Sequence, residues 1–391
     1  MSDQPLITRA FVLAASATLT LNLASFLFVH FPGFLQQLGA GEGEIGRIMA
    51  AQPLGAILAW PFVGRAVDMY GRRVVILTGC ALFVVVIVLY LCISALGPFV
   101  YVVRLLDGVA ATMWYAALFT HGADLVPAQR RTEGLAIFGA SGLITIGLGA
   151  AFGDAILAYA NYRALFFGAL GCSVLGLILC LRIRDVGLGA VDTGRPSRGI
   201  FAAAIQTNLL PVWYAAFAFF VSLGALFFFL KTFIAAANIG SVGGFFGVYA
   251  SIAIGLRLFL GWLPDRLGTR RMLGIAMSSY ALGFIVLAFA QTPMQILTAG
   301  LLCGIGHGYT YPVLFSLVVE RAGLRERGAA MAFYTAVDWL GLLVAGPAVG
   351  YAIEFLGYSV SFFGIAVVIF LGITIFYRFD HSTDPETVVT K

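Results

Sequence analysis

The sequence predicts an all-α polytopic membrane protein with twelve transmembrane helices in two parallel six-helix pseudo-repeats. Three observations support this fold class: the composition, the number of long apolar runs, and an internal repeat with an offset of about 197 residues. Hydrophobic residues make up 61% of the 391 residues and charged residues only 10%. A soluble protein carries about 25% charged residues, most of them on a hydrated surface. The outer surface of this protein is therefore expected to face lipid.

The composition also argues against several other classes of protein. The net charge is +5, but the basic residues lie in short gaps between apolar runs rather than in one patch, so no nucleic-acid partner is expected. The five cysteines lie inside apolar runs without metal-ligand spacing, so we expect buried, unpaired thiols and no metal site. The first apolar run is too long for a signal peptide and is expected to stay as the first membrane helix.

The elements follow from counting apolar runs. A helix that crosses the hydrocarbon core needs about 20 mostly apolar residues, and open strands cannot satisfy their backbone in lipid. The first half contains six such runs, at 10–35, 45–66, 74–95, 98–121, 134–158 and 164–182. After a polar segment the second half contains six more, at 209–235, 243–263, 272–291, 294–318, 328–354 and 358–378.

The same runs define the domain organisation and its orientation. We expect an N-terminal six-helix bundle over 1–182, a cytoplasmic linker over 183–208, a C-terminal bundle over 209–378 and a cytoplasmic tail over 379–391. With a cytoplasmic N-terminus, 18 of the 23 Lys and Arg residues fall on the inner side. The positive-inside rule therefore places both termini in the cytoplasm of a multi-pass cell membrane protein.

The two halves repeat one plan. Gly64, Asp68 and Arg73 match Gly261, Asp265 and Arg270 at an offset of 197, and Gly108 matches Gly304 at 196. Six spans return the chain to its starting side, so both halves run in the same direction. Parallel repeats of this kind meet at an axis along the membrane normal, with the substrate site near the middle of the membrane.

These motifs resemble those of the major facilitator superfamily. The pattern G-x-x-x-D-x-x-G-R-R over 64–73 has a copy over 261–270, and "RLLDG" follows in the span 98–121. The segments "DLVPAQRRTEG" and "ERAGLRERG" follow the fourth and tenth runs and add to the resemblance. The sequence of the second half is most similar to the proton-driven drug and metabolite efflux branch of this superfamily. The expected location is a bacterial cytoplasmic membrane.

The resemblance implies that the first motif, with Gly64, Asp68, Arg72 and Arg73, forms a cytoplasmic gate. A glycine lets a neighbouring helix approach closely, and a carboxylate can point at the positive N-terminus of a helix from the other half. Gly261, Asp265 and Arg270 form the second copy, in which Pro264 and Thr269 depart from the pattern. The alternative is that these arginines only fix the topology.

Charges inside the spans need a reason, because each costs about 2.5–3.5 kcal/mol at the centre of the membrane on insertion scales. Arg104 and Asp107 lie three residues apart on one helical face and can pair locally. The resemblance implies a role in proton coupling for Arg104, with Asp107 beside it. Structural pairing of the two side chains is the alternative.

The second half carries Arg257, His307 and Asp338 inside its spans. Asp338 is the leading candidate for a proton carrier, because an apolar site favours the neutral acid and a nearby arginine favours the carboxylate. The alternative is a permanent Arg257–Asp338 ion pair. His307, in "GIGHGYTYP", either titrates or donates to substrate, or is simply a packed polar group.

The resemblance implies a cavity lined by helices one, two, four, five, seven, eight, ten and eleven. All the charged residues named above as lying inside spans fall on these helices. Further polar and aromatic residues on them suit a site for amphipathic molecules. Together with Arg257 and His307 they form the predicted substrate cavity: Asn22, Trp114, Tyr115, Tyr309 and Tyr334. Each of these aromatics alone is also consistent with ordinary packing.

The predicted function is secondary active transport. No catalytic motif or phosphate-binding loop appears, so neither an enzyme nor an ATP-driven pump is expected. The first hypothesis is proton-coupled export of small amphipathic metabolites or drugs by alternating access, driven by a proton gradient without a cofactor. The alternative is uptake of a small organic anion or zwitterion, favoured by Arg257. The fifth span lacks the Gly-Pro of the family's antiporters, which counts against export. We expect a monomer whose partners are a small-molecule substrate and membrane lipid.

Overall fold

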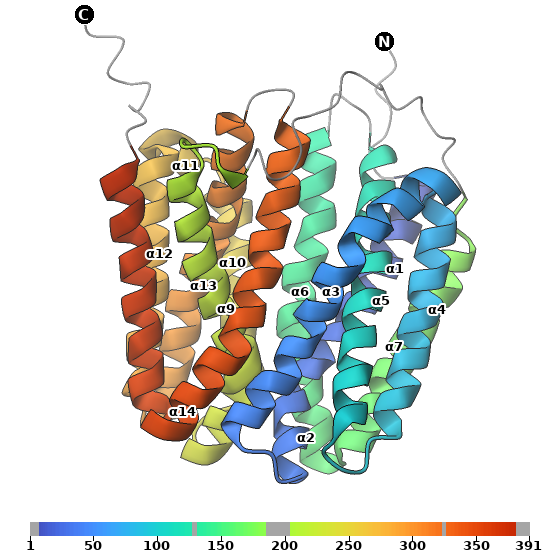
Figure 1. Ribbon diagram of the computed structural model, residues 1–391, viewed down its shortest axis with the longest axis horizontal. Coiled ribbons are helices and arrows are strands. Elements are labelled where there is room, and N and C mark those ends of the chain that lie inside the picture. Colours follow the sequence, from blue (N-terminus) through green and yellow to red (C-terminus); the bar gives the residue numbers. More distant parts are fainter. Residues whose placement is uncertain (1–7, 127–130, 185–203, 323–325, 381–391) are drawn as a thin grey trace, which may run out of the picture. The chain divides into compact units, whose positions relative to one another are not determined.

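The computed structural model describes residues 8–126, 131–184, 204–322 and 326–380, and of residues 68, 131–138 and 140 only the backbone. Within these ranges the chain forms helices and no strand (Figure 1). It divides into two compact units, Met1–Val191 and Asp192–Lys391. Most of the predicted linker 183–208 and of the predicted tail 379–391 lies outside the described residues, so the predicted domain boundaries stay a prediction.

The first unit contains the helices predicted for the first half. The first run becomes two α-helices joined by a 3₁₀ turn, and each later run becomes one helix. Their bounds are α1 Arg9–Leu27, η1 Phe28–His30, α2 Phe31–Gln37, α3 Glu42–Tyr70, α4 Arg72–Leu91, α5 Pro98–Asp124, α6 Arg131–Tyr159 and α7 Tyr162–Leu181. Within the unit, α5 packs between α3 and α4, and α7 packs against α1 and α4 (Figure 1).

The second unit repeats this packing. Its helices are α9 Leu210–Ala237, α10 Val242–Phe259, α11 Leu263–Leu267, α12 Thr269–Ala288, α13 Pro293–Arg321 and α14 Arg327–Phe379. Here α13 packs between α10 and α12, as α5 packs between α3 and α4. The second part of α14 takes the place of α7, and α14 packs on both α9 and α12. The repeat predicted from the motifs is therefore present in the internal packing of each unit.

Matched glycines explain how the repeated helix pairs approach so closely. A Cβ on Gly108 of α5 would stand 1.9 Å from the backbone oxygen of Gln52 on α3. A Cβ on Gly304 of α13 would stand 2.6 Å from the backbone oxygen of Tyr249 on α10. Both are far inside normal van der Waals contact, so only glycine permits these helix crossings.

Ten helices of the described chain are long and apolar enough to cross a membrane. One of them, α14, is 53 residues long and is broken at Gly357, which has a non-helical φ of 80°. It holds both predicted spans 328–354 and 358–378. Predicted span 45–66 lies within α3, which is not among the ten and contains Pro53 and Pro61. Each of the twelve predicted runs thus coincides with a helix over most of its length, and the runs 74–95, 243–263 and 272–291 extend past the ends of α4, α10 and α12.

The second glycine of each loop motif makes the turn between two helices. Gly71 separates α3 from α4 and Gly268 separates α11 from α12, and both have a φ of +83°. Side chains disfavour this left-handed region, and glycine adopts it freely. The repeat of Gly71 and Gly268 in the sequence therefore records a repeated backbone turn.

The second motif contains a break that the first lacks. The helix α3 runs without interruption to Tyr70, whereas α10 stops at Phe259 and the short α11 begins at Leu263. Pro264 has no N–H to donate to the carbonyl four residues earlier. That carbonyl, on Leu260, instead accepts hydrogen bonds from the Leu263 amide at 3.1 Å and from the Tyr309 hydroxyl at 3.1 Å. Pro264, which departs from the motif, thus accounts for the break.

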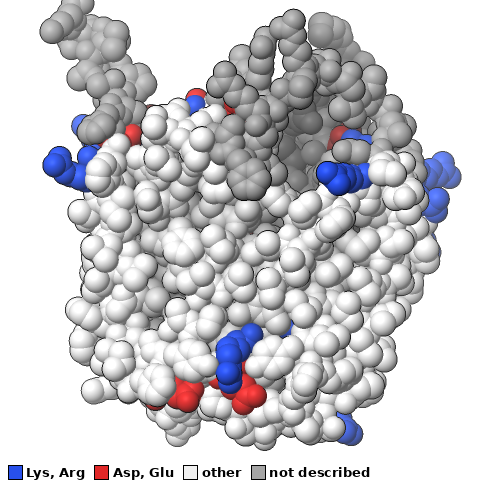
Figure 2. Space-filling view, in the orientation of Figure 1, with Lys and Arg blue, Asp and Glu red and all other residues white. Residues whose placement is uncertain are grey.

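The surface agrees with a membrane environment. On the face drawn in Figure 2, charged side chains gather toward the two ends of the helices, and the band between them is almost uncharged. All five cysteines are free, as predicted. The prediction that all are buried is wrong for Cys92, which is exposed near the end of α4, and for the half-buried Cys172. An apolar run on a membrane helix has a lipid-facing side as well as a packed one.

Candidate functional site

The first unit buries a closed polar cluster around Arg104, here called the Arg104 cluster. The side chains of Arg104 and Asp107 are 1% and 4% exposed and form an ion pair of 3.0 Å between Nη1 and Oδ2. The same carboxylate oxygen accepts from the Tyr90 hydroxyl at 2.9 Å and from Gln52 Nε2 at 3.2 Å. The cluster therefore joins α3, α4 and α5.

Arg104 has further partners in this cluster. Its Nη2 donates to Gln52 Oε1 at 3.0 Å and to the Met49 carbonyl at 3.3 Å. Its guanidinium also lies 5.6 Å from the ring centre of Phe31 on α2, a cation–π distance. The local pair predicted from the spacing of Arg104 and Asp107 is thus formed, and it is embedded in a polar network within the first unit. One donor of the network, Arg104 Nε, is buried without a hydrogen-bond partner among the described residues.

The second unit has a different arrangement, here called the Arg257 cluster: Tyr249 and Arg257 on α10, His307 and Tyr311 on α13, and Tyr334 and Asp338 on α14. Arg257 Nε donates to the Gly308 carbonyl at 3.3 Å. The phenol groups of Tyr311, Tyr249 and Tyr334 lie in its neighbourhood. Among the described residues no carboxylate pairs with it.

Asp338 likewise lacks an ion-pair partner in the described part of the chain. The permanent Arg257–Asp338 pair, one of the two interpretations of these residues, is therefore not formed. Asp338 is half-buried and follows Tyr334 by one helical turn, so the two side chains share a face of α14. The Tyr334 phenol lies in the neighbourhood of both Asp338 and Arg257.

His307 is packed tightly. It is 7% exposed, and its Nδ1 shares a short hydrogen bond with the Tyr249 hydroxyl. The ring of Phe219 meets it edge-on at 5.5 Å between centroids. The glycines around it set this position, because a Cβ on Gly306 would stand 2.5 Å from the Tyr280 Cβ. This arrangement matches the interpretation of His307 as a packed polar group.

The other predicted cavity residues divide into buried and exposed ones. Trp114 is 2% exposed and Asn22 is 6% exposed, and neither Trp114 Nε1 nor Asn22 Nδ2 has a hydrogen-bond partner in the described structure. Tyr115 is 45% exposed and meets Trp114 edge-on. Tyr309 is buried, and its hydroxyl donates to the Leu260 carbonyl at the break after α10. Tyr334 is 2% exposed and belongs to the Arg257 cluster.

The first loop motif makes contacts inside its own unit. Arg72 Nε lies 2.5 Å from the Asp124 carboxylate at the end of α5. Arg73 donates to the Leu181 carbonyl at the end of α7, at 3.4 Å. No described atom lies within 4 Å of a Cβ built on Gly64, so the close helix approach expected there is not found among the described residues. The Asp68 side chain lies outside the described residues, and its gate role stays a prediction.

The second motif repeats the arginine contact. Arg270 donates to the Tyr377 carbonyl at 3.3 Å and lies 3.7 Å from the Asp380 carboxylate, at the end of α14. A Cβ on Gly261 would stand 2.7 Å from the Arg257 carbonyl, so this glycine serves a local turn and not a helix approach. Asp265 is exposed and forms no ion pair with a described residue. The matched arginines, Arg73 on α4 and Arg270 on α12, thus each donate to a carbonyl at the C-terminal end of the last helix of their half.

Several residues of the clusters were missed from the sequence. Tyr90, Gln52 and Tyr249 are uncharged, and no motif marks them. One signal was available: Gln52 and Tyr249 match at the offset of 197 and each interrupts an apolar run. A third buried group is His30, whose Nε2 lies 3.0 Å from the Ala150 carbonyl and whose Nδ1 lies 3.8 Å from Asp154. Among the described residues no group of three His, Cys, Asp or Glu could hold a metal ion.

Comparison with known families and curated proteins identifies relatives over most of the chain. The family model of the Major Facilitator Superfamily matches residues 10–268 and again 238–391. An uncharacterized MFS-type transporter, YhhS of Escherichia coli (strain K12), is 21% identical over 384 residues, which cover 91% of this chain and 90% of that protein. Multidrug resistance protein 2 of Bacillus subtilis (strain 168) is 23% identical and covers 71% of this chain and 74% of its own.

Solved structures show the same fold at low sequence identity. The nucleoside transporter NupG aligns with a TM-score of 0.80 and 12% identity, over 96% of this chain and 100% of its own. A POT family transporter in complex with 5-aminolevulinic acid aligns with a TM-score of 0.81 and 13% identity, over 98% and 97%. The human organic anion transporter MFSD10 aligns with a TM-score of 0.71 and 16% identity, over 95% and 100%.

Proposed function

The chain belongs to the Major Facilitator Superfamily, and we propose that it is a proton-coupled exporter of small amphipathic organic molecules with Asp338 as its proton carrier. The observation that carries this proposal is a carboxylate on a membrane helix without an ion pair to any described residue. An ionisable group is expensive inside a membrane and is retained there mainly for function.

The two halves support this choice by contrast. Asp107 accepts from Arg104, Tyr90 and Gln52, so its carboxylate is paired and hydrogen-bonded inside the first unit. Asp338 has no comparable partner in the described chain, and therefore binds and releases a proton at smaller structural cost. The half-buried Tyr311 packs edge-on against the buried Tyr334, and its aromatic ring offers apolar surface with a polar edge, which suits an amphipathic ligand. Similarity to a multidrug resistance protein favours export.

The experiment uses the purified full chain. Thermal shifts against organic cations, anions and zwitterions identify a stabilising ligand, which is then added to proteoliposomes that contain a pH-sensitive dye. We expect ligand-driven proton flux in the native protein and its loss in Asp338→Asn, with ligand binding retained. Glu354→Gln, an exposed carboxylate on the same helix, is the matched control and should keep the flux. Undiminished flux in Asp338→Asn would exclude Asp338 as the carrier.

A second candidate function is transport of a small organic anion or zwitterion. It is favoured by Arg257, a half-buried cation that lies near phenol groups and has no carboxylate partner in the described residues. A substrate carboxylate would supply that partner. Stabilisation by organic anions that is lost in Arg257→Gln, but kept in Asp338→Asn and in the exposed control Arg163→Gln, would support this candidate over the first.

A further inference from the structure

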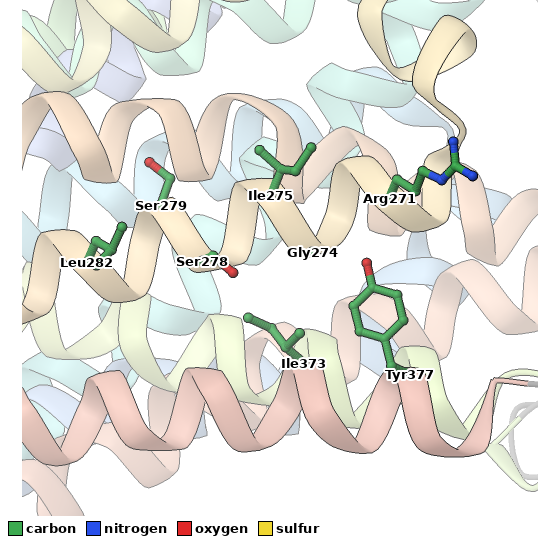
Figure 3. Close-up of a pocket in the computed structure, with 8 residues that line it drawn as sticks. All are labelled: Arg271, Gly274, Ile275, Ser278, Ser279, Leu282, Ile373 and Tyr377. Carbon is green, nitrogen blue, oxygen red and sulfur yellow. The ribbon is translucent and has the colours of Figure 1, made fainter.

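The second unit carries a groove between α12 and α14 that the transport proposal does not use. Figure 3 shows Ile373 and Tyr377 of α14 extending toward a row of residues along α12, with Arg271 at one end of the row and Leu282 at the other. The groove has a volume of about 690 Å³. Eight residues line the groove: Arg271, Gly274, Ile275, Ser278, Ser279, Leu282, Ile373 and Tyr377. Four of them are polar, namely Arg271, the tyrosine and the two serines, and the other four are glycine or aliphatic.

The apolar side chains of this groove are exposed on the surface of the second unit. Ile275 is 53% exposed and Leu282 is 48% exposed, although both lie on a helix that is apolar enough to cross a membrane. The superfamily resemblance leaves the ninth and twelfth helices, which correspond to α12 and the second part of α14, out of the cavity lining. These side chains are therefore expected to contact lipid acyl chains.

The charged end of the groove has no internal counter-ion. Arg271 is exposed and forms no ion pair with a described residue. The acidic group at the end of α14, Asp380, is engaged elsewhere, because it pairs with Arg321 at 3.0 Å and with Arg270 at 3.7 Å. The two adjacent arginines therefore have different roles: Arg270 holds the end of α14, and Arg271 offers its charge at the mouth of the groove.

A polar group lies deeper along the same face. Ser278 follows Arg271 by two helical turns, about 10 Å along the axis. Its hydroxyl has no hydrogen bond to a described residue, whereas the Ser279 hydroxyl donates to the Leu302 carbonyl at 2.9 Å. Along α12 the groove thus presents a cation at Arg271, then the apolar Ile275, the Ser278 hydroxyl without a described partner, and Leu282. A phospholipid presents a phosphate at one end and apolar acyl chains along the rest of its length, with ester oxygens near the phosphate.

We propose that this groove binds an anionic phospholipid, with the phosphate at Arg271 and an acyl chain along Ile275, Leu282 and Ile373. The positive-inside prediction places the Arg271 end in the cytoplasmic leaflet. Basic pockets between transmembrane helices on that side suit anionic head groups, and each basic residue near the surface contributes about 1 kcal/mol. The bound lipid would bridge α12 and α14 on their outer side.

Native mass spectrometry of the purified full chain tests this site. The probes are phosphatidylglycerol, phosphatidylcholine and inorganic phosphate, each titrated separately. We expect phosphatidylglycerol to bind more tightly than phosphatidylcholine, and Arg271→Gln to weaken its binding about fivefold. Ser278→Trp, which fills the groove without changing the charge, should weaken the binding of phosphatidylglycerol as well.

Arg182→Gln is the matched control, because Arg182 is an exposed arginine at the end of α7 in the other unit. It should leave binding unchanged. Equal loss in Arg182→Gln, or no loss in Arg271→Gln, would overturn the site. Full binding in Ser278→Trp would overturn the role of the groove. Equally tight binding of inorganic phosphate would show a free-anion site instead of a lipid site. None of these outcomes depends on which substrate the protein transports.

Discussion

At the scale of single residues, the two halves treat buried charge in different ways. Arg104 and Asp107 share a network with Gln52 and Tyr90, and every member contacts another. Arg257 and Asp338 lie on α10 and α14 without an ion pair to any described residue. We therefore interpret the first arrangement as structural and propose that the second leaves two charges available to a proton or a ligand. This contrast is why we place the transport chemistry in the second half.

The Arg104 cluster predicts an unequal pair of substitutions. Asp107→Asn removes the charge that compensates a buried arginine, and breaking such a pair costs about 3–5 kcal/mol. Tyr90→Phe removes one hydrogen bond to the same carboxylate, at a cost of about 1 kcal/mol. Denaturant unfolding in detergent should therefore rank Asp107→Asn far below Tyr90→Phe. Equal stabilities would show that the cluster does not contribute as an ion pair, and would favour the predicted proton-coupling role of Asp107.

At the scale of elements, close helix crossings and end contacts repeat between the halves. Gly108 and Gly304 let α5 and α13 approach α3 and α10. Arg73 and Arg270 each donate to a carbonyl at the C-terminal end of the last helix of their half, where a cation also complements the helix dipole. The motif arginines, expected as a gate, thus have contacts inside each unit that account for their repetition.

The helix crossing predicts a sharp difference between two glycines. Gly108→Ala would force its Cβ onto the Gln52 carbonyl, and overpacking of this kind costs about 1–3 kcal/mol. Gly64→Ala meets no described atom within 4 Å and should leave the stability of the purified protein unchanged. Thermal unfolding in one detergent compares the two directly. A loss of stability in Gly64→Ala would show that an element beyond the contacts described for the first unit approaches Gly64.

The end contacts predict local effects within one half. Arg270→Gln removes hydrogen bonding and charge from the end of α14, where hydrogen bonds to charged groups are worth about 1.5–3 kcal/mol. Hydrogen exchange of the last turn of α14 should accelerate by about 10- to 100-fold. Arg73→Gln should have a smaller effect at the end of α7, because Arg73 is exposed and the Arg270 side chain is only 28% exposed. Changes confined to the opposite half would instead support the gate.

At the scale of the whole molecule, the spans and the charge distribution predict one orientation. Each half contributes six predicted spans, so both ends of the chain lie on one side. Basic residues gather near 64–73 and 261–270, the ends that the positive-inside rule assigns to the cytoplasm. The groove at Arg271 then opens toward the inner leaflet, where anionic lipids attract basic residues.

Reporter fusions test this orientation. Green fluorescent protein fused after Lys391 should fluoresce, and alkaline phosphatase at the same point should be inactive, because the C-terminus is expected in the cytoplasm. Alkaline phosphatase fused after Asn161, in the turn between α6 and α7, should be active, because five spans precede it. The opposite pattern would reverse the orientation and move the proposed lipid site to the other leaflet.

The sequence by itself determined the number and order of the apolar spans, the repeat and the family. Hydropathy and motif spacing can be read from residues close together along the chain. It also marked Arg104 with Asp107 as a pair, since a spacing of three residues places both on one helical face. Only the tertiary structure decided that Gln52 and Tyr90 complete that pair, that Arg257 and Asp338 do not pair, and that Arg73 and Arg270 hold the ends of α7 and α14. These contacts join residues far apart in sequence. They depend on the rotation and crossing of packed helices, which no local pattern specifies.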